Sequence, residues 1–294
     1  METAIATRPQ ESPDNVQASD DSHLASLWLH GKALATQAAY TRDVTAFDCF
    51  TEGKTLRSVT LGDIQAFSDS LATSPASRRR TMAAVKSLFS FAAKIGYIRF
   101  DPAAAVKLPP VKDELAARIM PESSVQRILA MDTDRISPRN AALLRLLYVG
   151  GLRVSEACGL KWQDVQERGE SCQVTVYGKG GKTRVVLLTQ PAWESLRAIG
   201  CGASPTDPVF PSRKGKGHLS PVQVFRIVRA AARIAGIEGN VSPHWLRHCH
   251  ASHSLDNGAS VSLVSATLGH SSVAVTSRYL HARPDSSSAT YIRA

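Results

Sequence analysis

Several features that define common protein classes are missing from this sequence of 294 residues. Its five cysteines are scattered and form no Cys-x-x-Cys pair, which excludes a zinc ribbon and a disulfide framework. No apolar run approaches the roughly 20 residues that a transmembrane helix needs. The first 21 residues carry five acidic side chains and lack an apolar core, so they do not form a signal peptide. We therefore expect a cytoplasmic protein.

The chain also lacks the motifs of nucleotide-dependent and metal-dependent enzymes. It has no Gly-x-x-x-x-Gly-Lys-Ser/Thr loop to hold a phosphate, and no cluster of carboxylates to bind magnesium. Histidines do gather along one expected helix, but His250 and His253 face away from His244 and His248. Because tetrahedral zinc needs convergent ligands, we expect neither a metal ion nor another cofactor.

Positive charge is abundant in the parts of the chain that are expected to fold. The formal net charge is +10. Residues 22–105 carry 10 Lys and Arg against 6 Asp and Glu, and residues 106–294 carry 24 against 14. A basic surface favours nucleic acid as a partner, because neutralising phosphates releases their counterions. Charge alone leaves open a basic protein with no such partner.

The hydrophobic pattern indicates a mainly α protein with two folded domains. Residues 1–21 are polar and acidic, and we expect them to be disordered. Residues 22–105 place apolar side chains at helical intervals in four segments, which predicts a small four-helix domain. The stretch 106–118 contains a Pro-Pro pair and is expected to be the linker, so that residues 119–294 form the larger domain.

The larger domain is expected to be mostly helical with a small β-hairpin. Alternating apolar residues in 173–177 and 183–188 flank a glycine-rich turn, which is a typical hairpin pattern. Helical spacing of apolar residues predicts helices over residues 121–131, 138–149, 220–235, 243–257, 261–268 and 273–280.

Six side chains of this domain supply the groups needed to break a phosphodiester without a metal ion. They are Arg153, Lys179, His244, Arg247, His270 and Tyr279. A tyrosine can attack the phosphorus, two guanidiniums can hold the non-bridging oxygens, and a lysine can protonate the departing oxygen. His270 can donate to the phosphate or accept the proton of the tyrosine. Each residue taken singly has an ordinary structural alternative, such as a packing role for Tyr279.

The sequence around these residues resembles the tyrosine recombinase (phage integrase) family, and most of all its compact Xer-type members. The resemblance covers roughly residues 22–283. It rests on five motifs in the family's order, namely Gly151-Leu152-Arg153-Val154-Ser155-Glu156, Gly178-Lys179-Gly180-Gly181-Lys182, His244-Trp245-Leu246-Arg247, Leu268-Gly269-His270 and Tyr279. It implies a small core-binding (SAM-like) domain and a catalytic domain that close around duplex DNA as a clamp.

The resemblance also implies a role for each residue. Tyr279 is expected to be the nucleophile that forms a 3′-phosphotyrosine, Arg153 and Arg247 the phosphate clamp, and Lys179 the general acid for the 5′ oxygen. Tyr291 competes with Tyr279, and Lys182 and Arg184 compete with Lys179. Glu156 follows Arg153 by one helical turn and is expected to orient Arg153 or the histidine site, or else only to favour the helix N-terminus. We expect DNA contacts from Thr36, Gln37, Arg42, Arg78, Arg79, Arg80, Gln223 and Arg226.

The function implied by the resemblance is site-specific recombination of double-stranded DNA. The family acts as a homo- or hetero-tetramer on two short core sites, passes through a Holliday junction, and in some cases uses an accessory activator protein. The expected role is Xer-like dimer resolution in chromosome partition. The alternatives are a mobile-element integrase, a type IB topoisomerase, and a DNA-binding regulator without catalysis.

Overall fold

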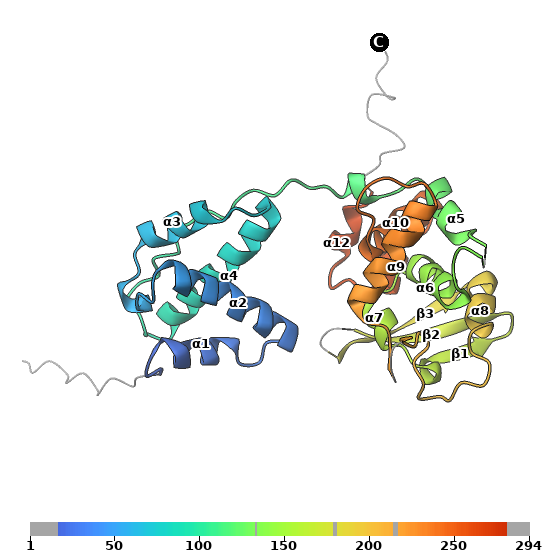
Figure 1. Ribbon diagram of the computed structural model, residues 1–294, viewed down its shortest axis with the longest axis horizontal. Coiled ribbons are helices and arrows are strands. Elements are labelled where there is room, and N and C mark those ends of the chain that lie inside the picture. Colours follow the sequence, from blue (N-terminus) through green and yellow to red (C-terminus); the bar gives the residue numbers. More distant parts are fainter. Residues whose placement is uncertain (1–16, 133, 179–180, 214–216, 281–294) are drawn as a thin grey trace, which may run out of the picture. The chain divides into compact units, whose positions relative to one another are not determined.

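The computed structural model describes residues 17–132, 134–178, 181–213 and 217–280 (Figure 1). The chain forms two compact units that divide between Lys112 and Asp113. Each unit has its own hydrophobic core, as is typical of separate domains. Among the described residues, no helix is both long and apolar enough to cross a lipid bilayer.

The N-terminal unit is a bundle of four helices, three of which begin at a side-chain cap. The helices are α1 (Asp21–Leu29), α2 (Leu34–Phe50), α3 (Leu61–Ser70) and α4 (Pro75–Lys94), with the short 3-10 turn η1 (Leu56–Ser58) before α3. Thr60 and Asp63 form a capping box at α3. At α4 the Ser74 side chain accepts from the Ser77 N–H, and Pro75 opens the helix. These signals are local, so the four helices agree with the four predicted segments.

Aromatic side chains fill the core of this unit. Phe47 on α2 meets Phe67 on α3 and Phe89 on α4 edge to face, with ring centroids 5.1 and 5.8 Å apart. Near α1, Trp28 stacks on Tyr40 at 5.0 Å. The core therefore ties all four helices together through a few large rings.

Residues 18–21 of the predicted tail are part of the N-terminal unit. Ala18 is buried, although the sequence predicts disorder through residue 21. Asp20 caps α1 by accepting from the His23 N–H. Asp21 accepts from the Leu56 N–H at 2.9 Å and from the Tyr97 hydroxyl at 2.7 Å. These long-range bonds fasten a segment whose composition alone suggests disorder.

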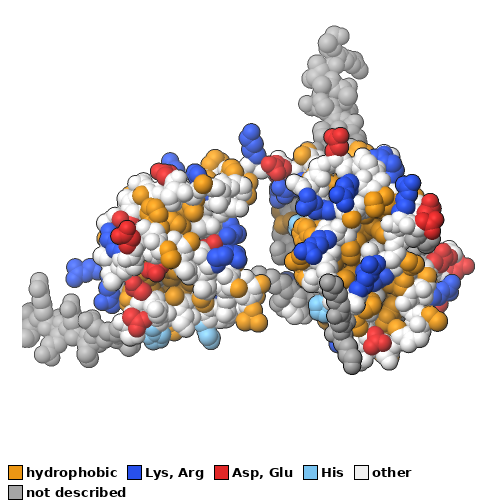
Figure 2. Space-filling model, in the orientation of Figure 1, with side chains coloured by type: hydrophobic (Ala, Val, Ile, Leu, Met, Phe, Trp, Pro, Cys, Tyr) orange, Lys and Arg blue, Asp and Glu red, His pale blue; other side chains and the backbone are white. Residues whose placement is uncertain are grey.

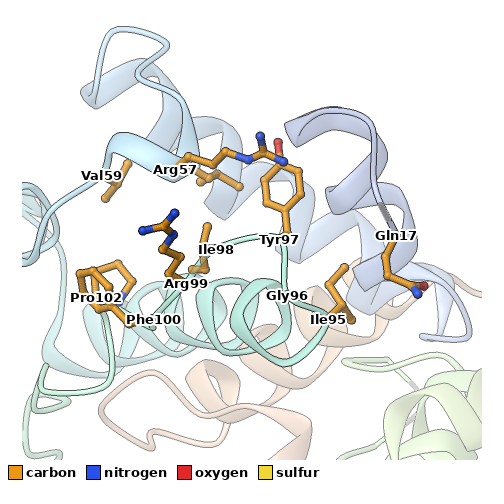
Figure 3. Close-up of a pocket in the computed structure, with 11 residues that line it drawn as sticks. Gln17, Arg57, Val59, Ile95, Gly96, Tyr97, Ile98, Arg99, Phe100 and Pro102 are labelled. Atoms are coloured by element: carbon orange, nitrogen blue, oxygen red, sulfur yellow. The ribbon is translucent and has the colours of Figure 1, made fainter. Parts of the chain in front are cut away.

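A surface hollow of about 770 Å³ lies in the N-terminal unit beside the turn that follows α4 (Figure 3). The Arg57 guanidinium lies over the Tyr97 ring, 4.4 Å from its centroid, and the exposed Phe100 also lines the hollow. None of the predicted catalytic or DNA-contact residues lines it. The hollow is therefore separate from the chemistry that the sequence predicts.

The C-terminal unit is mostly helical and contains one small sheet, as predicted. Its helices are α5 (Glu122–Leu129), α6 (Pro138–Val149), α7 (Val154–Gly159), α8 (Gln190–Arg197), α9 (Pro221–Ile234), α10 (Pro243–Asp256), α11 (Val261–Leu268) and α12 (Val273–Ser277). The sheet is antiparallel with strand order β1-β2-β3. Its strands are β1 (Val165–Arg168), β2 (Ser171–Tyr177) and β3 (Thr183–Leu188).

The predicted hairpin is the pair β2 and β3, in which Val174 lies opposite Val186 and Tyr177 opposite Thr183. Strand β1 and helix α8 were not predicted. Strand β1 has four residues with a single apolar side chain, and α8 spans only two turns. Both elements are too short to show a clear hydrophobic period. Pairing with β2 determines β1, and packing against α6 determines α8.

Helix α6 lies at the centre of the C-terminal unit and leads directly to the predicted site. Its buried side chains are Ala142, Leu143, Leu144, Leu146 and Leu147, and it packs against α8 and α10. The helix stops at Gly150-Gly151, and the chain then turns into α7. Arg153 is thereby held at the start of α7, next to the core.

Gly151 is the point of closest approach between this turn and its neighbours. Its φ of +57° favours glycine. A Cβ at this position would lie 2.7 Å from Leu268 Cδ2 and 2.8 Å from His250 Cδ2. The absence of a side chain therefore lets the ends of α6 and α11 approach α10.

We expect Gly151→Ala to destabilise the protein by about 2–4 kcal/mol, because a Cβ must be accommodated in a packed, left-handed position. Gly169→Ala is a matched control, since Gly169 also has a positive φ of +60° but a Cβ added there would meet no atom within 4 Å. Gly169→Ala should lose only about 1 kcal/mol of unfolding free energy, the cost of a left-handed backbone for a residue with a Cβ. Urea unfolding followed by circular dichroism checks this, and equal losses for the two variants would contradict the close approach.

Candidate active site

The C-terminal unit carries five of the six predicted catalytic residues in its described part. Arg153 is the N-cap of α7, His244 and Arg247 lie on α10, His270 follows α11, and Tyr279 follows α12 (Figure 1). Lys179 lies outside the described residues. Side chains separated by more than a hundred positions are thus brought to the ends of neighbouring helices.

Arg247 is buried and is held by the main chain. Its guanidinium donates to the carbonyl oxygens of Gly151 and Leu268, and the residue is only 3% exposed. Burial, and then the charge of Arg153, lower the pKa of Arg247 to about 10, so it stays positive at neutral pH. A fixed cation with neutral partners is well suited to hold an incoming anion.

Glu156 joins Arg153 to a second arginine, Arg184 on β3. Its carboxylate accepts from the Arg153 N–H at 2.8 Å and from Arg153 Nη1 at 2.9 Å. Arg184 donates to the same carboxylate through Nη1 at 2.9 Å and Nη2 at 2.8 Å. Burial opposes the charge on Glu156, but the bonds from Arg184 and Arg153 outweigh it and hold the pKa of Glu156 at about 2.

Arg153 remains the more accessible of the two arginines. Its side chain is 38% exposed, against 12% for Arg184. Arg153 and His244 line a hollow of about 720 Å³ together with Pro221, Phe225 and Trp245. The hollow therefore gives a ligand access to Arg153 and His244.

His270 is positioned by the end of α11. Gly269 adopts a left-handed conformation with φ +62°, and the His270 N–H donates to the Ser265 carbonyl at 3.1 Å, which closes the helix. His270 Nδ1 then lies 2.7 Å from Thr276 Oγ1 on α12. Burial, and then the charges of Arg247 and Arg153, lower the pKa of His270 to about 4. The ring is therefore neutral at pH 7.

Tyr279 is buried and hydrogen-bonded to a histidine for which the sequence predicted no role. Its hydroxyl lies 2.7 Å from His248 Nδ1. Burial, and then the electrostatic effects of His244 and Arg118, lower the pKa of His248 to about 4, so this ring is neutral at pH 7 and can accept a hydrogen bond from the phenol. Burial raises the pKa of Tyr279, while Arg247 and Arg278 act in the opposite direction. The sequence offered one indication of this contact: His248 follows His244 by four positions, so both rings lie on the same face of α10.

The remaining histidines of α10 face the core instead of the site. His250 Nδ1 lies 2.8 Å from the Tyr148 carbonyl oxygen. His253 bridges the Tyr148 hydroxyl and the Met120 carbonyl, both at 2.9 Å. In the part of the chain that the structure describes, no three His, Cys, Asp or Glu side chains gather as metal ligands.

The predicted DNA-contact residues of the N-terminal unit lie on α2 and at the start of α4. Arg78 and Arg79 donate to the carbonyls of Leu71 and Pro109, and Arg80 forms an ion pair with the buried Asp43. Thr36 and Gln37 lie in the first turn of α2, and Arg42 is exposed on the same helix. Structural bonds thus fix the three consecutive arginines, and Arg80 keeps a side chain that is 46% exposed.

The predicted contacts of the C-terminal unit lie on α9. Gln223 forms a capping box with Ser220 and also bonds Ser212 Oγ at 3.3 Å, so its amide is engaged within the chain. Arg226 is exposed one turn later. Lys and Arg side chains are numerous on the visible face of both units (Figure 2).

Two family models match the chain. Residues 118–285 match the phage integrase family, and residues 21–96 match the phage integrase N-terminal SAM-like domain. The tyrosine recombinase XerC of Xanthomonas campestris pv. campestris is 37% identical over 211 residues, which is 71% of this chain and 64% of that protein. XerD of Pseudomonas aeruginosa is 32% identical over 277 residues, or 89% and 91% of the two chains. XerD of Mycobacterium tuberculosis is 34% identical over 275 residues, or 85% and 88%.

Solved structures show the same fold. A lambda integrase dimer bound to a COC′ core site matches with a TM-score of 0.73 and 20% identity, over 91% of this chain and 77% of that one. The XerH recombinase in a pre-cleavage complex with difH matches with a TM-score of 0.69 and 19% identity, over 88% and 81%. The predicted arrangement of a SAM-like helical domain and a mostly helical second domain is therefore confirmed.

We expect Glu156→Gln to destabilise the protein by about 3 kcal/mol at pH 7 and by much less toward pH 2. The pKa of Glu156 is lowered from 4.5 to about 2, so its stabilising contribution is complete above about pH 4.5 and is lost as the pH falls toward 2. Urea unfolding at several pH values between 7 and 3 tests this, with the exposed Glu167→Gln as control. A loss for Glu156→Gln that does not change with pH would contradict the role of its two ion pairs.

Proposed function

Because the chain belongs to the phage integrase family of tyrosine recombinases, we propose that it cuts and rejoins double-stranded DNA at a specific short site. In this proposal Tyr279 is the nucleophile. The observation that carries the proposal is the arrangement of Arg247, Arg153 and Glu156, in which a carboxylate and two main-chain carbonyls hold two guanidiniums at adjoining helix ends.

The two arginines suit a phosphoryl-transfer transition state. When an oxygen attacks a phosphodiester, negative charge increases on the non-bridging oxygens. Arg247 is fixed before the substrate arrives, and Arg153 borders an open hollow, so neither needs extensive rearrangement to meet that charge. The neutral rings of His244 and His270 can donate further hydrogen bonds to the same oxygens.

Tyr279 and Lys179 complete the reaction. The phenol oxygen forms a bond to phosphorus while the bond to the 5′ oxygen breaks, and Lys179 donates a proton to that leaving oxygen. The phenol proton passes to a neutral imidazole, for which His248 is 2.7 Å away and His270 is an alternative. The 5′-hydroxyl of a partner strand then attacks the phosphotyrosine and releases Tyr279. The bond energy is conserved in the intermediate, so rejoining needs no ATP.

Double-stranded DNA is the partner that charge and structural likeness support. Both folded units are basic, and matched structures include XerH bound to difH and a lambda integrase tetramer bound to a Holliday junction. We propose that this protein acts as a tetramer on two DNA sites and passes through such a junction. Its proposed location is the cytoplasm, where it meets the DNA. The identity with XerC and XerD over most of the chain favours a Xer-like role in dimer resolution over integration of a mobile element.

Tyr279→Phe should abolish the covalent protein–DNA adduct, because no other atom replaces the phenol oxygen as nucleophile. The test incubates the protein with a nicked DNA site that traps the cleaved strand and resolves the adduct by denaturing electrophoresis. Tyr177→Phe, at a 63% exposed position on β2, should form the adduct normally. If the Tyr279→Phe protein still forms the adduct and the Tyr291→Phe protein does not, Tyr291 is the nucleophile.

Lys179→Ala should slow adduct formation by about 10²- to 10⁴-fold, the usual contribution of a general acid. A substrate with sulfur in place of the 5′ bridging oxygen should restore the rate, because a thiolate leaves without a proton. Lys182→Ala is the matched control and should need no such substrate. Rescue of Lys182→Ala but not of Lys179→Ala would reverse the assignment.

A further inference from the structure

Arg184 on β3 contacts two other elements of the C-terminal unit through one guanidinium. Nη1 and Nη2 donate to Glu156 on α7 at 2.9 and 2.8 Å. Nε donates to the Thr267 carbonyl at the end of α11, at 2.7 Å. Arg184 itself lies on β3, and its side chain is only 12% exposed. This geometry is typical of a structural link and leaves little surface for contact with DNA.

The first link leads to Arg153. Glu156 shares its Oε1 between Arg184 Nη1 and Arg153 Nη1, both at 2.9 Å, and its Oε2 between Arg184 Nη2 and the Arg153 N–H, both at 2.8 Å. Without Arg184 the buried carboxylate would depend on Arg153 alone for neutralisation. It would then hold the Arg153 guanidinium more tightly and compete with a phosphate for it.

The second link leads to His270. The Arg184 Cδ lies 3.0 Å from the position that a Cβ would take on Gly269, so its side chain packs directly against the turn that ends α11. The Thr267 carbonyl belongs to the same turn. This turn sets the direction in which the chain presents His270, which follows immediately.

We propose that Arg184 is a positioning residue that sets Arg153, through Glu156, and His270, through the turn at residues 267–269. The inference rests on the proposed function, since it assigns both targets to the phosphate site. It replaces the expectation that Arg184 competes with Lys179 as general acid. A guanidinium that already donates three bonds, two of them to a carboxylate, acts on the reaction through its neighbours.

The test separates DNA binding from cleavage. Arg184→Ala should slow single-turnover adduct formation by about 100-fold, and Arg184→Lys by about tenfold, because a lysine keeps the charge but cannot make the paired bonds. The Kd for the duplex site should change by less than about threefold for both. Arg168→Ala, at an exposed position on β1, is the matched control and should cleave at the wild-type rate.

A double-mutant cycle tests whether the effect passes through Glu156. In a Glu156→Gln background, Arg184→Ala should slow cleavage by less than about tenfold, because the ionic link is already broken. Three results would each overturn the proposal. Arg184→Ala could still slow cleavage 100-fold in the Glu156→Gln background, the Kd for DNA could rise as much as the cleavage rate falls, or the 5′ sulfur substrate could restore the rate. If Arg184→Ala does not fold, Arg184→Lys decides, and cleavage at the wild-type rate overturns the proposal. If the wild-type protein itself forms no adduct, that result contradicts the proposed function and not the role of Arg184.

Discussion

The carboxylate of Glu156 is the group on which the arrangement of the site depends. It is nearly inaccessible to water and lies between Arg153 and Arg184, and the hydrogen bonds and charges of these two residues favour its ionised form against burial. Two cations around one carboxylate leave a net positive charge, to which Arg247 adds a third guanidinium. The same interaction therefore closes the fold locally and leaves the surplus charge that an anionic substrate needs.

The site combines the ends of several helices with one face of α10, which carries His244, Arg247 and His248. Arg153 starts α7, His270 follows the left-handed end of α11, and Arg247 donates to carbonyls that end α6 and α11. Helix ends carry backbone groups without intrahelical partners, and Arg247 uses one of them, the Leu268 carbonyl, together with the Gly151 carbonyl in the turn after α6. Gly151 allows the required approach because it has no side chain. Packing of α6, α10 and α11 thus fixes the positions of the charges.

Tyr279, the proposed nucleophile, adjoins this frame through α10. Tyr279 is buried, and its hydroxyl is engaged with His248. Attack on a phosphate requires that hydroxyl to leave or share the bond with His248, whereas the arginines already lie in place. The helix that precedes Tyr279 is short, with only five residues in α12, but it packs against α11 and its Thr276 is fully buried.

The sequence by itself determined the mainly α fold, the two helical units, the β2–β3 hairpin and the residues to which catalysis is assigned. Local signals carried these, such as the capping residues Thr60 and Asp63 and the apolar spacing of α6. Only the tertiary structure decided that Arg184 pairs with Glu156, 28 positions away, that His248 meets Tyr279, 31 positions away, and that Arg247 reaches the Gly151 carbonyl, 96 positions away. Helical spacing grouped His248 with His244, but it did not specify the partner of either ring or of the two arginines. These partners meet only where packed helices and strands bring distant backbone segments within bonding distance.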